Sequence, residues 1–271
     1  MSDALKLLVV TRGHAFDRSA FMAMFDDDRG LDAVAVDQPA AQILLRPEHV
    51  ADYDAVLFYD MWGIALPGQP PIEPPADYAE SVSALLEAGT GIVLLNHALI
   101  SWPAWPLWRE LSATSFLLSE AMLGGTLTPG SGFRGGAGQP DRNTSMTLRA
   151  ELPGHPVLAG LEDGFTITDE LYLKTPGFER DVVPLLRSDF TFEAEHFSPP
   201  PLAPEGERTN WTHPTGSDLV VWARATRSSP VVACELGDGP DAYGNPAFRR
   251  LVGNAVRWVA SEEARRWAAN A

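Results

Sequence analysis

The chain has 271 residues, of which 45% are hydrophobic and 21% are charged, so we expect a folded globular protein with a sizeable core. Its 20 basic and 36 acidic side chains give a formal net charge of −16, which argues against nucleic acid or an anionic membrane surface as a partner. The single cysteine excludes an internal disulfide and a multi-cysteine metal site. Because the sequence has no apolar run of membrane-spanning length and no signal-peptide pattern, we expect a cytoplasmic protein.

The first third of the chain alternates apolar runs with amphipathic segments. The continuous apolar run at 5–11 predicts a strand buried on both faces, the alternation at 31–37 suits a second strand, and 54–60 and 91–96 predict two more. Helical spacing of apolar residues over 15–25 and 78–86 predicts helices between them. Parallel neighbours need a crossover connection, so this alternation predicts βαβ units and a parallel sheet.

The middle of the chain is rich in glycine and proline. Short candidate strands lie at 144–149, 165–168, 184–190 and 218–223. We expect residues from about 118 to 215 to be insertions that cover one end of the sheet, within a single domain spanning 1–271. A buried strand is predicted at 230–236, and Asn245 followed by Pro246 predicts the start of a helix that packs on the sheet.

Polar residues follow several predicted strands, and in an open parallel sheet ligands bind beyond the carboxyl ends of the strands. His14 follows the first strand, Asp60 ends the third, His97 follows the fourth and Asp238 follows the last. His97 lies in a strand–turn–helix segment that can hold one side chain at the sheet edge, where an imidazole can serve as a base or a metal ligand. A histidine that only hydrogen-bonds its own loop is the structural alternative.

Asp169 and Glu170 are adjacent carboxylates after a short predicted strand, close to Tyr172. Burial beside aromatic rings would raise a carboxyl pKa and make it a proton donor or base, whereas adjacent acids in so acidic a chain are commonly solvated. Trp102 opens a series of tryptophans at every third residue. Indole faces stack on sugar rings, but the same spacing is typical of a helix core, and exposed tryptophans could equally form the interface of a homo-oligomer.

Other motifs carry less weight. The glycines at 130, 132 and 135 fit a dinucleotide-binding pattern, but Thr-Pro precedes them and no helix can open after them. Cys234 lies inside a predicted buried strand, so we expect an inert thiol. The histidines show no metal-binding spacing, so a metal site must be assembled from distant segments.

Four segments in this order together resemble the ThuA-like, trehalose-utilisation family. The first segment ends at His14 and the second ends at His97. The third runs from 155 to Tyr172, and the fourth runs from 237 to 258. The resemblance implies a flavodoxin-like three-layer α/β sandwich with a mostly parallel sheet, related to class I glutamine amidotransferase domains, with loop-rich insertions in this chain. Those amidotransferases place a cysteine where this chain has His97 between Asn96 and Ala98, so we expect no glutaminase activity.

The resemblance also implies breakdown of trehalose or related disaccharides, alongside oxidoreductases that produce keto-sugars. Asp238 stands where the family frequently has histidine. If that histidine takes part in a site in the family, its chemistry is altered or lost in this chain. The small-molecule ligand implied is a sugar.

The leading hypothesis is a carbohydrate-processing protein, a lyase or hydrolase. A base would take the proton next to the carbonyl of a keto-sugar, while an acid or a divalent metal such as zinc, manganese or iron stabilises the enolate. The alternative is a non-catalytic sugar-binding or regulatory module. The candidate catalytic residues are His97, Asp169 and Glu170, and the candidate binding residues are His14, Asp60, Trp102, Tyr172 and Asp238.

Overall fold

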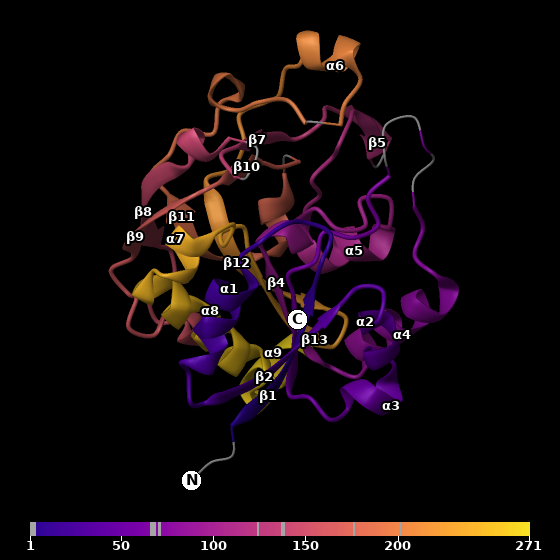
Figure 1. Ribbon diagram of the computed structural model, residues 1–271, viewed down its shortest axis with the longest axis vertical. Coiled ribbons are helices and arrows are strands. Elements are labelled where there is room, and N and C mark those ends of the chain that lie inside the picture. The colour runs from indigo at the N-terminus through magenta and orange to yellow at the C-terminus, as the bar shows by residue number, and fades with distance from the viewer. Residues whose placement is uncertain are drawn as a thin grey trace.

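The computed structural model describes residues 4–65, 69, 72–123, 125–136, 139–175, 177–200 and 202–271 (Figure 1). Within these residues nine strands form one large sheet, and helices cover both of its faces. The α/β class predicted from alternating apolar and amphipathic segments is therefore confirmed.

One half of the sheet is a parallel block. It contains β1 (Leu5–Thr11), β2 (Leu31–Asp37), β3 (Ala55–Phe58), β4 (Gly91–Leu95) and β13 (Ser229–Cys234). Their order is β2-β1-β3-β4-β13, the flavodoxin-like arrangement, with parallel pairing throughout. The inner strands are buried on both faces, as in the fully buried stretch from Leu7 to Val10, whereas the edge strand β2 alternates and leaves Val34 exposed.

Helices form a layer on each side of the sheet. Figure 1 shows α1, α7 and α8 on one side of the molecule and α2, α3 and α4 on the other. The first layer contains α1 (Arg18–Asp26), α7 (Pro240–Tyr243), α8 (Pro246–Val259) and α9 (Glu262–Ala268). The second contains α2 (Ala41–Leu44), α3 (Pro47–Val50), α4 (Ala76–Glu87) and α5 (Pro106–Ser112).

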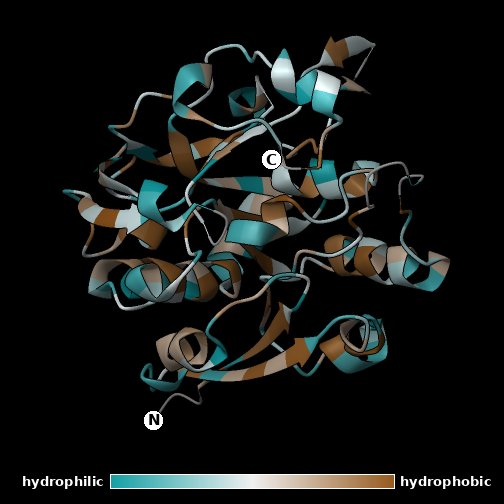
Figure 2. Ribbon diagram, turned by 45° about the horizontal axis from the view of Figure 1, so that its top comes forward, coloured by the Kyte–Doolittle hydropathy of each residue, from teal (hydrophilic) through white to brown (hydrophobic). Residues whose placement is uncertain are grey.

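Two apolar cores fill the spaces between sheet and helices. Successive residues of β1 alternate between them, with Leu7 and Val9 in one core and Leu8 and Val10 in the other. Figure 2 shows hydrophobic residues running along the strands. Helices cover both faces of the parallel block, so polar groups that bind a ligand are expected beyond the carboxyl ends of its strands.

The other half of the sheet is antiparallel. It contains β12 (Leu219–Thr226), β11 (Val183–Ser188), β8 (Thr144–Ala150) and β9 (Phe165–Asp169), in that order from β13 outward. β8, β9 and β11 come from residues 118–215, so the expectation that this region only covers one end of the sheet is corrected. Met146 and Leu148 of β8 are buried while Ser145 and Thr147 are exposed, the alternation of a strand packed on one face.

The rest of the inserted region lies over the carboxyl ends of the parallel strands. It contains the hairpin of β5 (Ala121–Leu123) and β6 (Thr126–Thr128), the pair β7 (Gly132–Arg134) and β10 (Leu171–Leu173), and α6 (Glu205–Thr209). Short 3₁₀ helices are η1 (Asn96–Leu99), η2 (Pro140–Arg142), η3 (Pro156–Leu158), η4 (Phe178–Asp181) and η5 (Ala194–His196).

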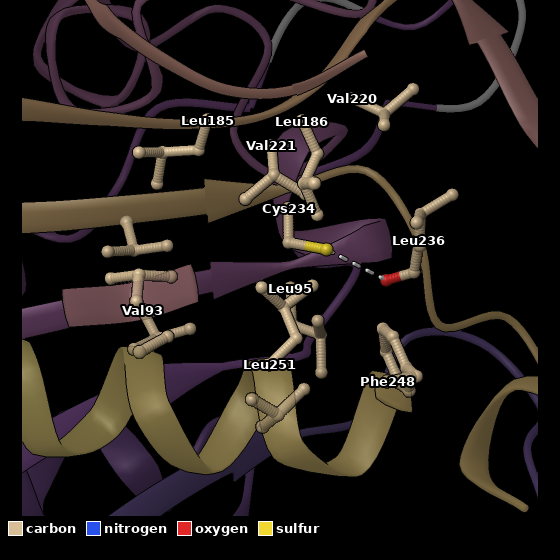
Figure 3. Close-up of a cluster of buried hydrophobic side chains, with 14 of the residues drawn as sticks. Val93, Leu95, Leu185, Leu186, Val220, Val221, Cys234, Leu236, Phe248 and Leu251 are labelled. Carbon is tan, nitrogen blue, oxygen red and sulfur yellow. Dashed lines mark hydrogen bonds between the residues drawn. The ribbon is translucent and has the colours of Figure 1, made fainter. Parts of the chain in front are cut away.

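Cys234 lies in the core, as expected from its place in a buried strand. Its side chain packs among Leu95, Val221 and Leu251, and Sγ donates weakly to the Leu236 carbonyl at 3.8 Å (Figure 3). Burial raises the pKa of this thiol, so it stays protonated and unreactive. In the described part of the chain no helix has the length and apolar character needed to cross a membrane.

Candidate functional site

A left-handed turn holds His97 at the carboxyl end of β4. Asn96 adopts φ +47°, a conformation that asparagine tolerates better than most residues. Its side-chain amide donates to the Glu235 carbonyl at 2.8 Å and to Glu170 Oε1 at 3.1 Å. The turn therefore ends the strand and ties it to the two segments that surround the imidazole.

The His97 imidazole faces two carboxylates and stacks on a second histidine. His97 Nε2 lies 3.5 Å from Asp238 Oδ1 and 3.8 Å from Glu170 Oε1. Its ring is 3.7 Å, centroid to centroid, from the ring of His14, which donates from Nε2 to the Tyr59 carbonyl at 3.0 Å. Burial lowers the pKa of both imidazoles, that of His97 well below its usual value, so at neutral pH His97 is an uncharged base.

Glu170 is buried beside this base. Its Oε1 accepts hydrogen bonds from the Tyr172 hydroxyl and the Asn96 amide. Burial, followed by the charge of Asp238, raises the pKa of Glu170 well above its usual value, which favours the protonated acid. Burial also raises the pKa of Asp238. A neutral base and a neutral acid thus lie side by side, the arrangement that acid–base catalysis requires.

Asp169, predicted as catalytic, does not face His97. Its Oδ2 accepts from the Gly237 N–H at 2.6 Å, and its Oδ1 accepts from the N–H groups of Asp238 and Glu170 at 3.2 and 2.9 Å. Burial raises its pKa to about 7 despite these bonds. Asp169 is therefore a positioning residue, which fixes the loop that carries Asp238 against the strand end that carries Glu170.

A buried ion pair supports the same strand end. Lys174 Nζ pairs with Glu235 Oε2, and the Tyr172 N–H donates to Glu235 Oε1 at 2.6 Å. Both charged groups are shielded from water. Removing one partner alone would leave a buried charge, so the pair fixes β10 relative to the residue that follows β13.

A cavity of about 280 Å³ opens above His97 and Glu170. Polar groups lie at its base and most of its wall is apolar. Glu170 and Tyr172 come from the segment around β10, and Gly135 and Gly136 come from the turn after β7. It is lined by Met61, His97, Ile100, Phe116, Leu118, Phe133, Gly135, Gly136, Glu170 and Tyr172.

His97 and Glu170, at the base of the cavity, form together with Asp238 a group that has the chemistry of a metal site. His97, Glu170 and Asp238 each offer one ligand atom, and these atoms lie within 4.8 Å of one another. One imidazole and two carboxylates suit a divalent ion such as manganese, iron or zinc. The residues therefore fit the divalent metal that the sequence analysis named as one possibility.

The structure corrects two of the predicted binding residues. Trp102 packs against Tyr78 and Trp105 and is 2% exposed, so it belongs to the core and not to the cavity wall. Asp60 is fully buried and accepts from Gln38 Nε2 at 2.9 Å. It lies just beyond the end of β3, and among the described residues its carboxyl forms no hydrogen bond or ion pair with His14 or His97.

Sequence reasoning missed the glycines that close the site. Gly136 has φ +72°, and a Cβ there would lie 2.2 Å from Glu170 Oε2. Gly135 has φ +91°, and a Cβ there would lie 2.4 Å from Asn143 Oδ1. The glycine-rich run was tested only as a dinucleotide motif, although glycine also marks close backbone approach.

Several solved structures that are similar to this chain share its fold at low sequence identity. A ThuA-like protein from Parabacteroides merdae is 14% identical with a TM-score of 0.66, covering 95% of this chain and 90% of its own. A ThuA-like protein from Bacteroides uniformis is 18% identical with a TM-score of 0.61, covering 97% and 94%. A cytoplasmic protein from Salmonella typhimurium is 12% identical with a TM-score of 0.56, covering 94% and 99%.

The comparison with curated protein sequences finds no match. The family profile described as "ThuA: Trehalose utilisation" matches residues 6–259, nearly the whole chain. With the flavodoxin-like strand order and the similar ThuA-like structures, this match shows that the chain belongs to the ThuA family.

Proposed function

We propose that this protein is an enzyme of carbohydrate utilisation that removes the proton next to the carbonyl of a keto-sugar. The observation that carries the proposal is the geometry at the base of the cavity, where His97 Nε2 lies 3.8 Å from Glu170 Oε1, and burial favours the uncharged form of both groups. The family description, trehalose utilisation, supports a sugar as substrate.

The two residues would move two protons. His97 Nε2 takes the proton from the carbon next to the carbonyl, and the electron pair of that C–H bond moves toward the carbonyl oxygen. Glu170 gives that oxygen its proton, which leaves an enediol, an imidazolium and a carboxylate. The enediol can accept a proton at the other carbon, an isomerisation, or expel a leaving group from the neighbouring carbon, a lyase reaction.

The neighbouring residues hold this pair in place. The stacked His14 ring fixes the plane of His97, and Tyr172 and Asn96 hold the Glu170 carboxyl. If a divalent ion were held by His97, Glu170 and Asp238, these groups would act as its ligands in place of base and acid, and the ion would supply Lewis-acid stabilisation of the enolate oxygen. No cysteine or serine occupies the turn after β4, so the site offers no acyl-enzyme nucleophile there.

His97→Ala tests the proposal. The variant removes the base, so turnover of a keto-disaccharide such as keto-trehalose should fall about 10²- to 10⁴-fold. Exchange of the proton next to the carbonyl with deuterated solvent, followed by NMR, reports the same step directly. His49→Ala, on α3, is the matched control and should keep wild-type rates.

Unchanged turnover in His97→Ala would overturn the proposal. Thermal stabilisation of the wild-type protein by a keto-sugar, with neither product nor solvent exchange, would instead favour the non-catalytic sugar-binding module.

A further inference from the structure

We infer that the cavity selects an uncharged sugar derivative with an apolar aglycone, in preference to a disaccharide or a sugar phosphate. The inference rests on the proposed function and specifies its substrate class. It starts from a third apolar cluster, separate from the two cores that flank the sheet. Ile100, Phe116 and Tyr172 form its buried part.

This cluster faces the space above the reacting groups. Met61, Leu118 and Phe133 are partly exposed, pack on the cluster and line the cavity. Core residues are buried between layers, whereas these side chains present apolar surface to a cavity that also contains His97 and Glu170. A bound apolar group would remove that surface from water, which is favourable.

The wall offers little to the hydroxyl groups of a second sugar ring. Besides the backbone, the polar groups of the lining are His97, Glu170 and the Tyr172 hydroxyl, and that hydroxyl already donates to Glu170. Hydroxyls placed against the apolar wall would lose their water without gaining a partner. The cavity is also small: its volume of about 280 Å³ lies below the range of about 300–1,000 Å³ that is typical of pockets for drug-sized ligands.

The charges around the cavity disfavour an anionic ligand. Among the described residues that line it, none is lysine or arginine, and Glu170 lies at its base. Arg134 follows Phe133 in the chain, but its guanidinium donates to Thr144 Oγ1 and to the His196 carbonyl. A phosphate group would therefore be desolvated without a cationic partner.

The test compares substrates that differ only in the group beyond the reacting sugar. We would measure kcat/KM for the keto forms of phenyl glucoside, methyl glucoside and trehalose, with glucose 6-phosphate as a competing ligand. The phenyl compound should exceed both others at least tenfold in kcat/KM, which corresponds to about 1.4 kcal/mol. Glucose 6-phosphate should not compete.

Variants of the wall test the cause of the preference. Leu118→Ser and Phe133→Ser should each lower kcat/KM for the phenyl compound severalfold more than for the methyl compound. Both positions are partly exposed, and circular dichroism checks that each variant folds. Ile43→Ser, an exposed apolar position on α2, is the matched control.

The outcomes separate this inference from the proposed function. Equal kcat/KM for the three compounds, or competition by glucose 6-phosphate, would overturn the inference and leave the sugar chemistry standing. Wall variants that slow all compounds equally would overturn it as well. Failure of all three compounds to react would overturn the proposed function and this inference together.

Discussion

Single residues in this protein are constrained by what lies within a few ångströms of them. His97 becomes a base because burial lowers its pKa, and Glu170 becomes an acid because burial raises its pKa. The same physical cause acts in opposite directions on the two groups, because the charged form is the protonated one in histidine and the deprotonated one in glutamate. Their roles follow from their shared environment.

Gly136→Ala should damage the site without unfolding the protein. The new Cβ would meet Glu170 Oε2 at 2.2 Å, so the carboxyl must move away from His97. We expect kcat to fall at least tenfold, measured on the keto-sugar substrate. Gly125→Ala is the control, because Gly125 also has a left-handed φ of +84° but nothing within 4 Å of its Cβ position. Equal effects of the two variants would assign the loss to backbone strain alone.

Asp60→Asn should change how stability depends on pH. Burial raises the pKa of Asp60 to about 7, from about 3.9 in the unfolded chain. Between these values the folded protein holds a proton that the unfolded chain has lost, so the stabilisation is complete below about pH 4 and is lost as pH rises toward 7. Relative to the variant, the wild-type free energy of unfolding should fall by about 1.4 kcal/mol per pH unit in this window.

Urea denaturation at several pH values between about 5 and 8 measures this difference, and the opposite pH dependence of the buried histidines cancels between wild type and variant. Asp26→Asn, at an exposed position, is the control. A constant difference between wild type and Asp60→Asn across this range would contradict the assignment.

Among the elements, α8 connects the candidate site to the core. Phe248 and Leu251 lie on its buried face, and the helix begins directly after the α7 segment that follows Asp238. Asn245 caps it, accepting at Oδ1 from the N–H groups of Ala247 and Phe248 at 2.9 and 3.3 Å. The same side chain donates from Nδ2 to the Thr166 carbonyl at 2.9 Å.

Asn245→Ala should lower the free energy of unfolding by about 1–2 kcal/mol, because it removes the cap and the bond to β9. Asn245→Asp keeps the cap acceptor and loses the donor, so it should recover most of the loss. Urea denaturation of both variants separates the two contributions. Equal destabilisation by alanine and aspartate would show that the bond to Thr166 dominates over the cap.

At the scale of the whole molecule, the candidate metal site joins three distant segments. His97 follows β4, Glu170 lies between β9 and β10, and Asp238 lies between β13 and α7. A ligand that contacts all three stabilises the folded chain only, since the unfolded chain does not bring them together.

A divalent ion should therefore raise the melting temperature. At a concentration of about 100 times Kd, manganese or zinc would add about 2.7 kcal/mol to the free energy of unfolding. Asp238→Asn should abolish most of this gain, whereas Asp241→Asn, an exposed position three residues along, should keep it. Elemental analysis of protein purified without chelator gives the stoichiometry. An identical response of both variants would place the ion elsewhere.

Much of the fold was predictable from local patterns. The strands at 5–11 and 31–37 and the cap at Asn245 agree with the structure. A continuous apolar run, an alternating segment and a helix N-cap residue can each be recognised from neighbouring residues alone. The strands of the inserted region were recognised, but their membership of the main sheet was not. Strand pairing over long separations depends on partners that a local pattern does not specify.

The amino-acid sequence by itself determined the parallel α/β block, the absence of a nucleophilic cysteine at the turn after β4, and the chemical types that meet at the sheet edge. Only the tertiary structure decided that Asp238 faces His97 and Asp169 does not, that Trp102 is buried, and that apolar side chains cover the site. The physical reason is that periodicity encodes burial along one element, whereas distances between elements are set by packing of the whole chain.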